Sequence, residues 1–146
     1  MFSKTCEYAI RATIYLASAY NGEDRIGIHD ICENIEAPQH FTAKILQVLT
    51  GKDLISSRKG VHGGFYITKE QMKVRLIDIV YAVDGDAVFN GCAIGLQKCS
   101  ETSPCPLHDK FKPIREKLKR VLESSTIIEL ANDIKSGEHV LKSIQT

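Results

Sequence analysis

Residues 38–66 read PQHFTAKILQVLTGKDLISSRKGVHGGFY. Proline is favoured at the start of a helix and glycine just after its end, so the segment predicts a helix over residues 38–50. Short apolar runs at 54–57 and 65–68 then flank the glycine-rich stretch 58–64, which predicts a β-hairpin. The connection of this hairpin contains an arginine and a lysine, so its tip is basic.

The residues around this segment predict further helices. Apolar residues recur at helical spacing over residues 3–19, with Ser3 as N-cap, and over 28–35, which a tight turn joins to the next helix. Another amphipathic helix is expected over 75–83. Helix, short helix, turn, helix and glycine-tipped hairpin is the order of a winged helix-turn-helix. The sequence therefore predicts a mainly α fold with a small β-hairpin and a winged helix-turn-helix DNA-binding domain in residues 1–85.

The helix predicted over 38–50 would be the one that enters the major groove of DNA. Projected at 100° per residue, it has an apolar face, expected to point inward, formed by Phe41, Ile45, Val48 and Leu49. The other face is polar, and glutamine amides can pair with the hydrogen-bonding edge of adenine. The expected DNA-contacting residues of this helix are Gln39, His40, Ala43, Lys44 and Gln47.

Contacts to the DNA backbone are expected from the hairpin and from the first helix. The formal net charge is only +1, so DNA binding must come from local placement of charge rather than from a polycationic surface. Arg58, Lys59 and His62 lie in the predicted wing. Ser3 and Lys4 lie at a helix N-terminus, where free N–H groups favour a phosphate. Each of these residues alone is also typical of an ordinary solvated surface.

The segment 86–106 has weak periodicity and contains three of the five cysteines. Cys92, Cys99, Cys105 and His108 are separated by six, five and two residues. Three thiolates that converge on a metal centre could order such a loop, and sulfur ligands favour iron-sulfur clusters or zinc. Structural zinc sites use cysteines that are closer in sequence than these, so the wide spacing favours an iron-sulfur cluster, which is larger than a single ion. Free buried thiols and a reversible disulfide remain open alternatives.

The C-terminal part predicts a long helix and a shorter one. An apolar stripe runs through residues 107–124, which requires a partner surface, and a short helix follows, so 107–131 is expected to be helical. Residues 132–146 are expected to form a polar, loosely held tail. Two remaining cysteines, Cys6 and Cys32, lie on apolar helix faces and are interpreted as core residues.

Three stretches together resemble the Rrf2 family of bacterial winged-helix transcription regulators over residues 1–130. They are SKTCEYAIR at 3–11, RKGVHGGF at 58–65 and the loop with three cysteines. The resemblance implies a homodimer on double-stranded DNA, with the long helix 107–124 as the dimerisation helix.

The resemblance also implies a cluster, either 2Fe-2S or 4Fe-4S, bound by Cys92, Cys99 and Cys105. In IscR-like members a histidine at the position of His108 completes the site. In NsrR-like members a carboxylate from the opposite subunit does so, and Glu7 of the partner subunit would occupy that place. The local spacing favours His108 slightly. The first cysteine gap is one residue longer here than in IscR-like members.

We therefore expect a sequence-specific DNA-binding regulator, a repressor, whose DNA affinity responds to redox state, nitric oxide or iron-sulfur status through its cluster. The alternative is a zinc-stabilised winged-helix regulator or adaptor. No nucleophile, general base and orienting carboxylate form a recognisable set, so we expect neither an enzyme nor a small-molecule substrate. The sequence contains no membrane-spanning stretch and no secretory signal, which predicts a cytoplasmic protein. A cluster of this kind can be lost on aerobic purification.

Overall fold

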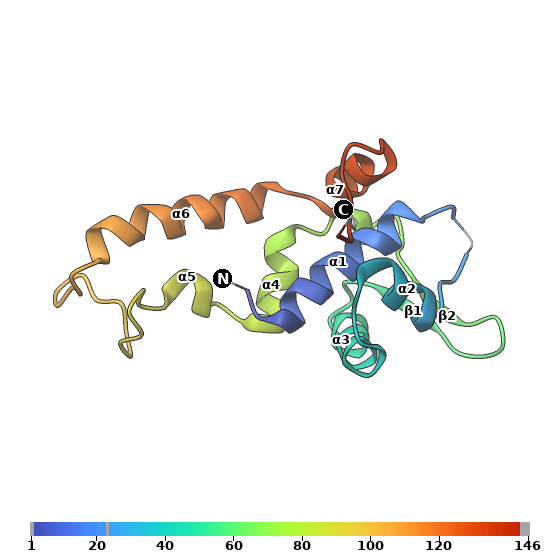
Figure 1. Ribbon diagram of the computed structural model, residues 1–146, viewed down its shortest axis with the longest axis horizontal. Coiled ribbons are helices and arrows are strands. Elements are labelled where there is room, and N and C mark those ends of the chain that lie inside the picture. Colours follow the sequence, from blue (N-terminus) through green and yellow to red (C-terminus); the bar gives the residue numbers. More distant parts are fainter. Residues whose placement is uncertain (1, 23, 144–146) are drawn as a thin grey trace.

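The computed structural model describes residues 2–22 and 24–143 and is mainly helical (Figure 1). Its elements, in chain order, are α1 (Lys4–Ser18), α2 (Ile28–Ile35), α3 (Gln39–Gly51), β1 (Ser56–Arg58), β2 (Gly64–Tyr66), the 3-10 helix η1 (Gln71–Lys73), α4 (Leu76–Asp84), α5 (Ala87–Asn90), α6 (His108–Ser124) and α7 (Ile127–Lys135). The predicted mainly α fold with a small hairpin is confirmed.

Helix α1 forms the centre of the core and packs against α2, α3, α4 and α7. Its N-cap is Ser3, whose hydroxyl oxygen accepts a hydrogen bond from the backbone N–H of Cys6 at 3.0 Å, as the sequence predicts. Cys6 and Cys32 are both buried, which agrees with their interpretation as core residues. The largest fully buried side chains of the core are Leu16, Ile31, Ile35, Leu46, Leu49, Ile55, Ile67, Ile79 and Ile127.

Helices α2 and α3 form the expected pair with a tight turn. Glu36 ends α2 in the left-handed conformation, with φ of 54°, and the N–H of Ala37 returns to the carbonyl of Cys32 at 3.1 Å. Pro38 is the N-cap of α3 and stands one residue before the helix, not within its first turn. This turn orients α3 with its N-terminus exposed to solvent.

The inward face of α3 differs from the one predicted. Phe41 and Val48 were expected inside but are 51% and 43% exposed, whereas Thr42 and Leu46 are buried. Thr42 can be buried because its hydroxyl donates to the carbonyl of Pro38 at 2.8 Å, so no polar group is left unpaired. Phe41 and Val48 instead line a shallow apolar groove between α3, α1 and α4.

Strands β1 and β2 pair antiparallel, with Ser57 opposite Phe65. Both strands lie nearer the loop tip than the expected ranges 54–57 and 65–68, because Ile55 and Ile67 are buried in the core and anchor the base of the hairpin. Ile26 extends the sheet by two 2.8 Å hydrogen bonds with Phe65.

A side chain at either of two wing glycines would collide with backbone. A Cβ on Gly63 would lie 2.2 Å from the carbonyl oxygen of Arg58. Gly64 has a φ of 149°, and a Cβ there would lie 2.7 Å from the carbonyl oxygen of Ile26. The wing conformation therefore requires glycine at both positions.

Helix α6 extends away from the main core and packs against α4 and α5, so that the loop before it and the hairpin lie at opposite ends of the long axis (Figure 1). Leu122 is buried and Leu118 half-buried against the small core formed with α4 and α5. The rest of the predicted stripe is exposed in the single chain, namely Leu107, Phe111, Ile114 and Val121.

Helix α7 begins at Ile127 and ends at Lys135, so it extends four residues into the range predicted as a loose tail. Ile134 packs against the main core, which explains the longer helix. Residues 144–146 of the predicted tail, like Met1, lie outside the described residues. Within the described part, no helix combines the length and the apolar character needed to span a bilayer.

Candidate metal centre and nucleic-acid interface

The polar face predicted for α3 is exposed. Gln39, His40, Lys44 and Gln47 are solvent-accessible, while Ala43 is half-buried between them. The His40 ring contacts the Phe41 ring in a tilted arrangement, with the ring centroids 4.4 Å apart, which orients the imidazole at the N-terminal end of the helix. This arrangement presents hydrogen-bonding side chains along one helix, as base reading in the major groove requires.

The wing presents its basic residues to solvent. Arg58 ends β1, and Lys59 and His62 lie in the turn; all three are exposed. Val61 at the tip is 97% exposed, a residue that the sequence reasoning did not single out. An apolar side chain held at a wing tip can contact deoxyribose, and the signal in the sequence was its position between Lys59 and the glycine pair.

Ser3 and Lys4 both have partners in the single chain. The backbone N–H of Ser3 donates to the carboxylate of Asp84 at 3.0 Å, and its hydroxyl also donates to that carboxylate. Lys4 lies 3.1 Å from Glu7 and remains largely exposed. A DNA phosphate at this helix end would have to share Ser3 with Asp84.

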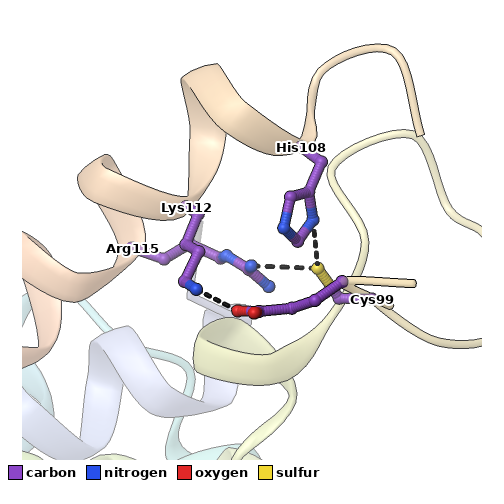
Figure 2. A network of polar contacts seen from close by, with 5 residues as sticks. Cys99, His108, Lys112 and Arg115 are labelled. Carbon is purple, nitrogen blue, oxygen red and sulfur yellow. Dashed lines mark hydrogen bonds and ion pairs between the residues drawn. The ribbon is translucent and has the colours of Figure 1, made fainter. Parts of the chain in front are cut away.

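The cysteine-bearing segment connects α5 to α6, and its cysteines are half-buried free thiols. The Sγ of Cys99 lies 3.1 Å from Nδ1 of His108, the first residue of α6 (Figure 2). His108 is buried, which fixes the imidazole against the loop. The structure thus brings two of the four predicted ligands into contact.

Two cations of α6 also contact this loop. Arg115 donates to Sγ of Cys99 at 3.0 Å and to the carbonyl oxygen of Gly91 at 2.6 Å. Lys112 forms an ion pair with Glu101 (Figure 2). Residues 108, 112 and 115 follow helical i, i+4, i+7 spacing, so a projection of α6 could have found this face. The sequence reasoning missed it because it followed only the apolar stripe.

Cys92 and Cys105 form the second pair. The backbone N–H groups of Ile94 and Leu96 lower the pKa of Cys92, and a contact with the side chain of Cys105 lowers it further. Among the residues that the structure describes, no three His, Cys, Asp or Glu side chains gather closely enough to hold a metal ion. The four predicted ligands are therefore arranged as two pairs. Glu7 is half-buried beside Lys4 in the same chain.

Comparison with known proteins identifies the family. The model of the Rrf2 family, described as an iron-dependent transcriptional regulator, matches residues 2–133. The chain belongs to the Rrf2 family. A putative HTH-type transcriptional regulator of Aquifex aeolicus is 32% identical to this Rrf2 chain over 135 residues, which cover 90% of the chain and 92% of that protein. The regulator NsrR of Geobacillus kaustophilus is 26% identical over 93% of the chain and 92% of its own length.

Solved structures of other regulators share the fold of this Rrf2 protein. CymR, the global cysteine regulator of B. subtilis, superposes with a TM-score of 0.72 at 23% identity, over 90% of this chain and 96% of CymR. IscR of T. potens gives a TM-score of 0.71 at 18% identity, over 96% and 92% of the two chains. The predicted winged-helix fold is confirmed. The protein is a transcriptional regulator of the Rrf2 family and, like its relatives, not an enzyme.

Proposed function

We propose that this Rrf2 protein is a cytoplasmic, homodimeric repressor that binds a specific double-stranded DNA operator and whose affinity is set by an iron-sulfur cluster. The contact between Cys99 and His108 carries the proposal, because it brings a thiol of the loop and an imidazole of α6 together in one half-buried place at the start of that helix. The signal would be redox state, nitric oxide or iron-sulfur status.

The donor set fits a cluster. Three free thiols and an imidazole are soft and borderline ligands of the kind that iron-sulfur centres use. The backbone N–H groups that lower the pKa of Cys92 favour the thiolate form that binds metal. The Nε of Arg115 is buried without a hydrogen-bond partner among the described residues, which leaves a donor for an additional acceptor beside Cys99. Cys92, Cys99 and Cys105 would hold the group, which supplies one-electron redox chemistry when bound.

The fourth ligand is proposed to be His108. Its ring already contacts Cys99 and is buried, so little ordering remains before it binds. Glu7 of the partner subunit is the alternative, and it would have to leave its ion pair with Lys4. Glu7→Gln should keep the cluster and His108→Ala should lose or alter it; the reverse result would assign the carboxylate.

The exposed stripe of α6 supports a homodimer. Phe111, Ile114 and Val121 lie on one side of the helix and are exposed in the single chain. A symmetric dimer would present two copies of α3 to half-sites roughly 34 Å apart, one helical turn of DNA. The cysteine loop joins α5 to α6, so rearrangement of this loop can change the spacing between the two reading helices.

DNA contacts are proposed to divide by element. Gln39 and Gln47 of α3 would read bases, with His40 and Lys44 beside them, and Arg58 and Lys59 of the wing would bind phosphates. Gln39→Ala together with Gln47→Ala should reduce discrimination between DNA sequences. Arg58→Ala should weaken binding to all sequences and flatten the salt dependence. Identical behaviour of the two variants would contradict this division.

The cluster is tested by anaerobic purification followed by visible absorption and by iron and sulfide analysis. The wild type should be coloured and contain both elements, and Cys99→Ala should lose them. Cys32→Ala is the matched control, because Cys32 is buried in α2 and should keep the cluster. Colourless wild-type protein that contains only zinc would establish the zinc-stabilised alternative and overturn the proposal.

A further inference from the structure

Arg115 joins the start and the middle of the cysteine loop to the long helix. One guanidinium nitrogen, Nη1, donates to the carbonyl of Gly91, which precedes Cys92, and Nη2 donates to the sulfur of Cys99. The side chain belongs to α6, whose neighbouring stripe is exposed. A single residue therefore connects the predicted ligand Cys99 and the residue before Cys92 with the proposed dimerisation helix. Figure 2 shows its contact with Cys99.

The chemistry of this contact is specific to arginine. A planar guanidinium offers donors in a fixed fork and can serve two acceptors at once, whereas a lysine ammonium acts as a compact point charge. The positive charge of Arg115 lies next to the sulfur of Cys99, and a ligating sulfur becomes more negative when electrons are added to its cluster. A hydrogen bond from a cation to a ligating sulfur stabilises the more negative state of an iron-sulfur centre.

The third nitrogen of the Arg115 guanidinium, Nε, is also available to an acceptor beside Cys99. This atom is buried and has no hydrogen-bond partner among the described residues, so this donor is available to an additional acceptor. Cys99, His108 and Arg115 line one cavity of about 460 Å³, whose other charged residues are Lys112, Lys119, Glu101 and Glu116. The cavity provides room for such an acceptor next to the Cys99 sulfur.

We propose that Arg115 is a positioning residue that ties the cysteine loop to α6 and favours the reduced state of the bound cluster. The proposal rests on the proposed cluster function. Reduction adds one electron from an external one-electron donor to the cluster and breaks no bond of the protein. The guanidinium stays charged throughout and supplies no proton.

Two variants separate charge from geometry. Arg115→Gln removes the charge, and Arg115→Lys keeps it but cannot bridge Gly91 and Cys99 together. Arg120→Gln and Arg120→Lys are matched controls, because Arg120 is exposed on the same helix and lies 140° around it from Arg115 at 100° per residue. Both pairs carry the same chemical change on the same helix.

The first measurement uses cluster-free protein and follows hydrogen exchange of the loop backbone. In both Arg115 variants, the hydrogen-bonded amides of Gly91 and Gly95 should exchange about tenfold faster than in the wild type, because a contact that holds the loop against α6 has been removed. The Arg120 variants should match the wild type. Unchanged hydrogen exchange in the Arg115 variants would show that Arg115 does not hold the cysteine loop against α6, whether or not the protein takes up a cluster.

The second measurement is the reduction potential of anaerobically reconstituted protein, titrated with a chemical reductant. In Arg115→Gln, the ratio of reduced to oxidised cluster at a given potential should fall about tenfold. For a one-electron couple this is a decrease of 59 mV in the reduction potential. Arg115→Lys should fall between it and the wild type. Equal potentials for Arg115→Gln and Arg120→Gln would overturn the redox role, while a wild type without any cluster would overturn the proposed function instead.

Discussion

Replacing Gly63 by alanine should disable the wing while leaving the reading helix intact. The added Cβ would lie 2.2 Å from the carbonyl oxygen of Arg58 and 2.9 Å from that of Gly60. Both are backbone atoms, so the turn itself must move. The N–H of Gly63 also closes this turn on Gly60 at 3.0 Å, and that hydrogen bond would be lost or lengthened. Arg58 and Lys59 would then leave their positions next to the DNA backbone.

The size of the effect follows from counterion release. Each neutralised phosphate contributes about −0.9 to the slope of log K against log salt concentration, so two lost contacts reduce the slope by about 1.8. At 0.15 M salt this corresponds to about 30-fold weaker binding. Base reading by α3 should persist, so the preference for the operator over a scrambled duplex should change much less.

Fluorescence anisotropy with a duplex selected by the wild-type protein measures both quantities over a salt series. Gly51→Ala is the matched control, because Gly51 ends α3 and the space for its Cβ is open. Thermal unfolding of both variants checks that the core is retained. A salt slope for Gly63→Ala equal to that of Gly51→Ala would refute the assignment of the wing as a phosphate-binding element.

Three further predictions concern the dimer, the base of the wing and the thiols. Ile114 is 60% exposed in the single chain and would be buried in the proposed dimer. Ile114→Glu removes this burial from both copies, so it should weaken dimerisation at least about 30-fold in analytical ultracentrifugation, whereas Arg120→Glu should not. Gln71 is buried and bonds Asp53, Ser56 and Thr68, so Gln71→Leu should destabilise the fold by about 2 kcal/mol in urea denaturation. Burial and nearby Asp84 raise the pKa of Cys6 to about 12, whereas the pKa of Cys92 is lowered. At pH 8, iodoacetamide should therefore modify Cys92 of the cluster-free protein well before Cys6. Equal modification rates in mass spectrometry would contradict this.

The boundaries of the first helices could be predicted because local signals agree with packing there. Ser3 caps α1, and the apolar period of 28–35 coincides with the buried face of α2. The buried face of α3 was harder to predict, because the helix carries two overlapping stripes of residues that could face inward and that share Ile45 and Leu49. Periodicity could not choose between them, since it counts Thr42 as polar and ignores that Pro38 accepts its hydrogen bond.

The candidate site was only partly accessible to sequence reasoning. Cys99 and His108 are nine positions apart and their spacing signals a common site, and the structure does bring them into contact. Arg115 contacts Gly91 across 24 positions, and only the fold reveals such a pair. Helix α5 has four residues, too short for a periodic signal.

The central claim is that the cluster sets the affinity for DNA. The most direct measurement is an anaerobic anisotropy titration of one dimer preparation, divided into cluster-loaded and cluster-free samples whose iron and sulfide contents are determined. If the cluster sets the affinity, the dissociation constants for the operator should differ by about 5- to 150-fold, the usual range of coupling between two sites. Equal constants in the two samples would contradict this claim.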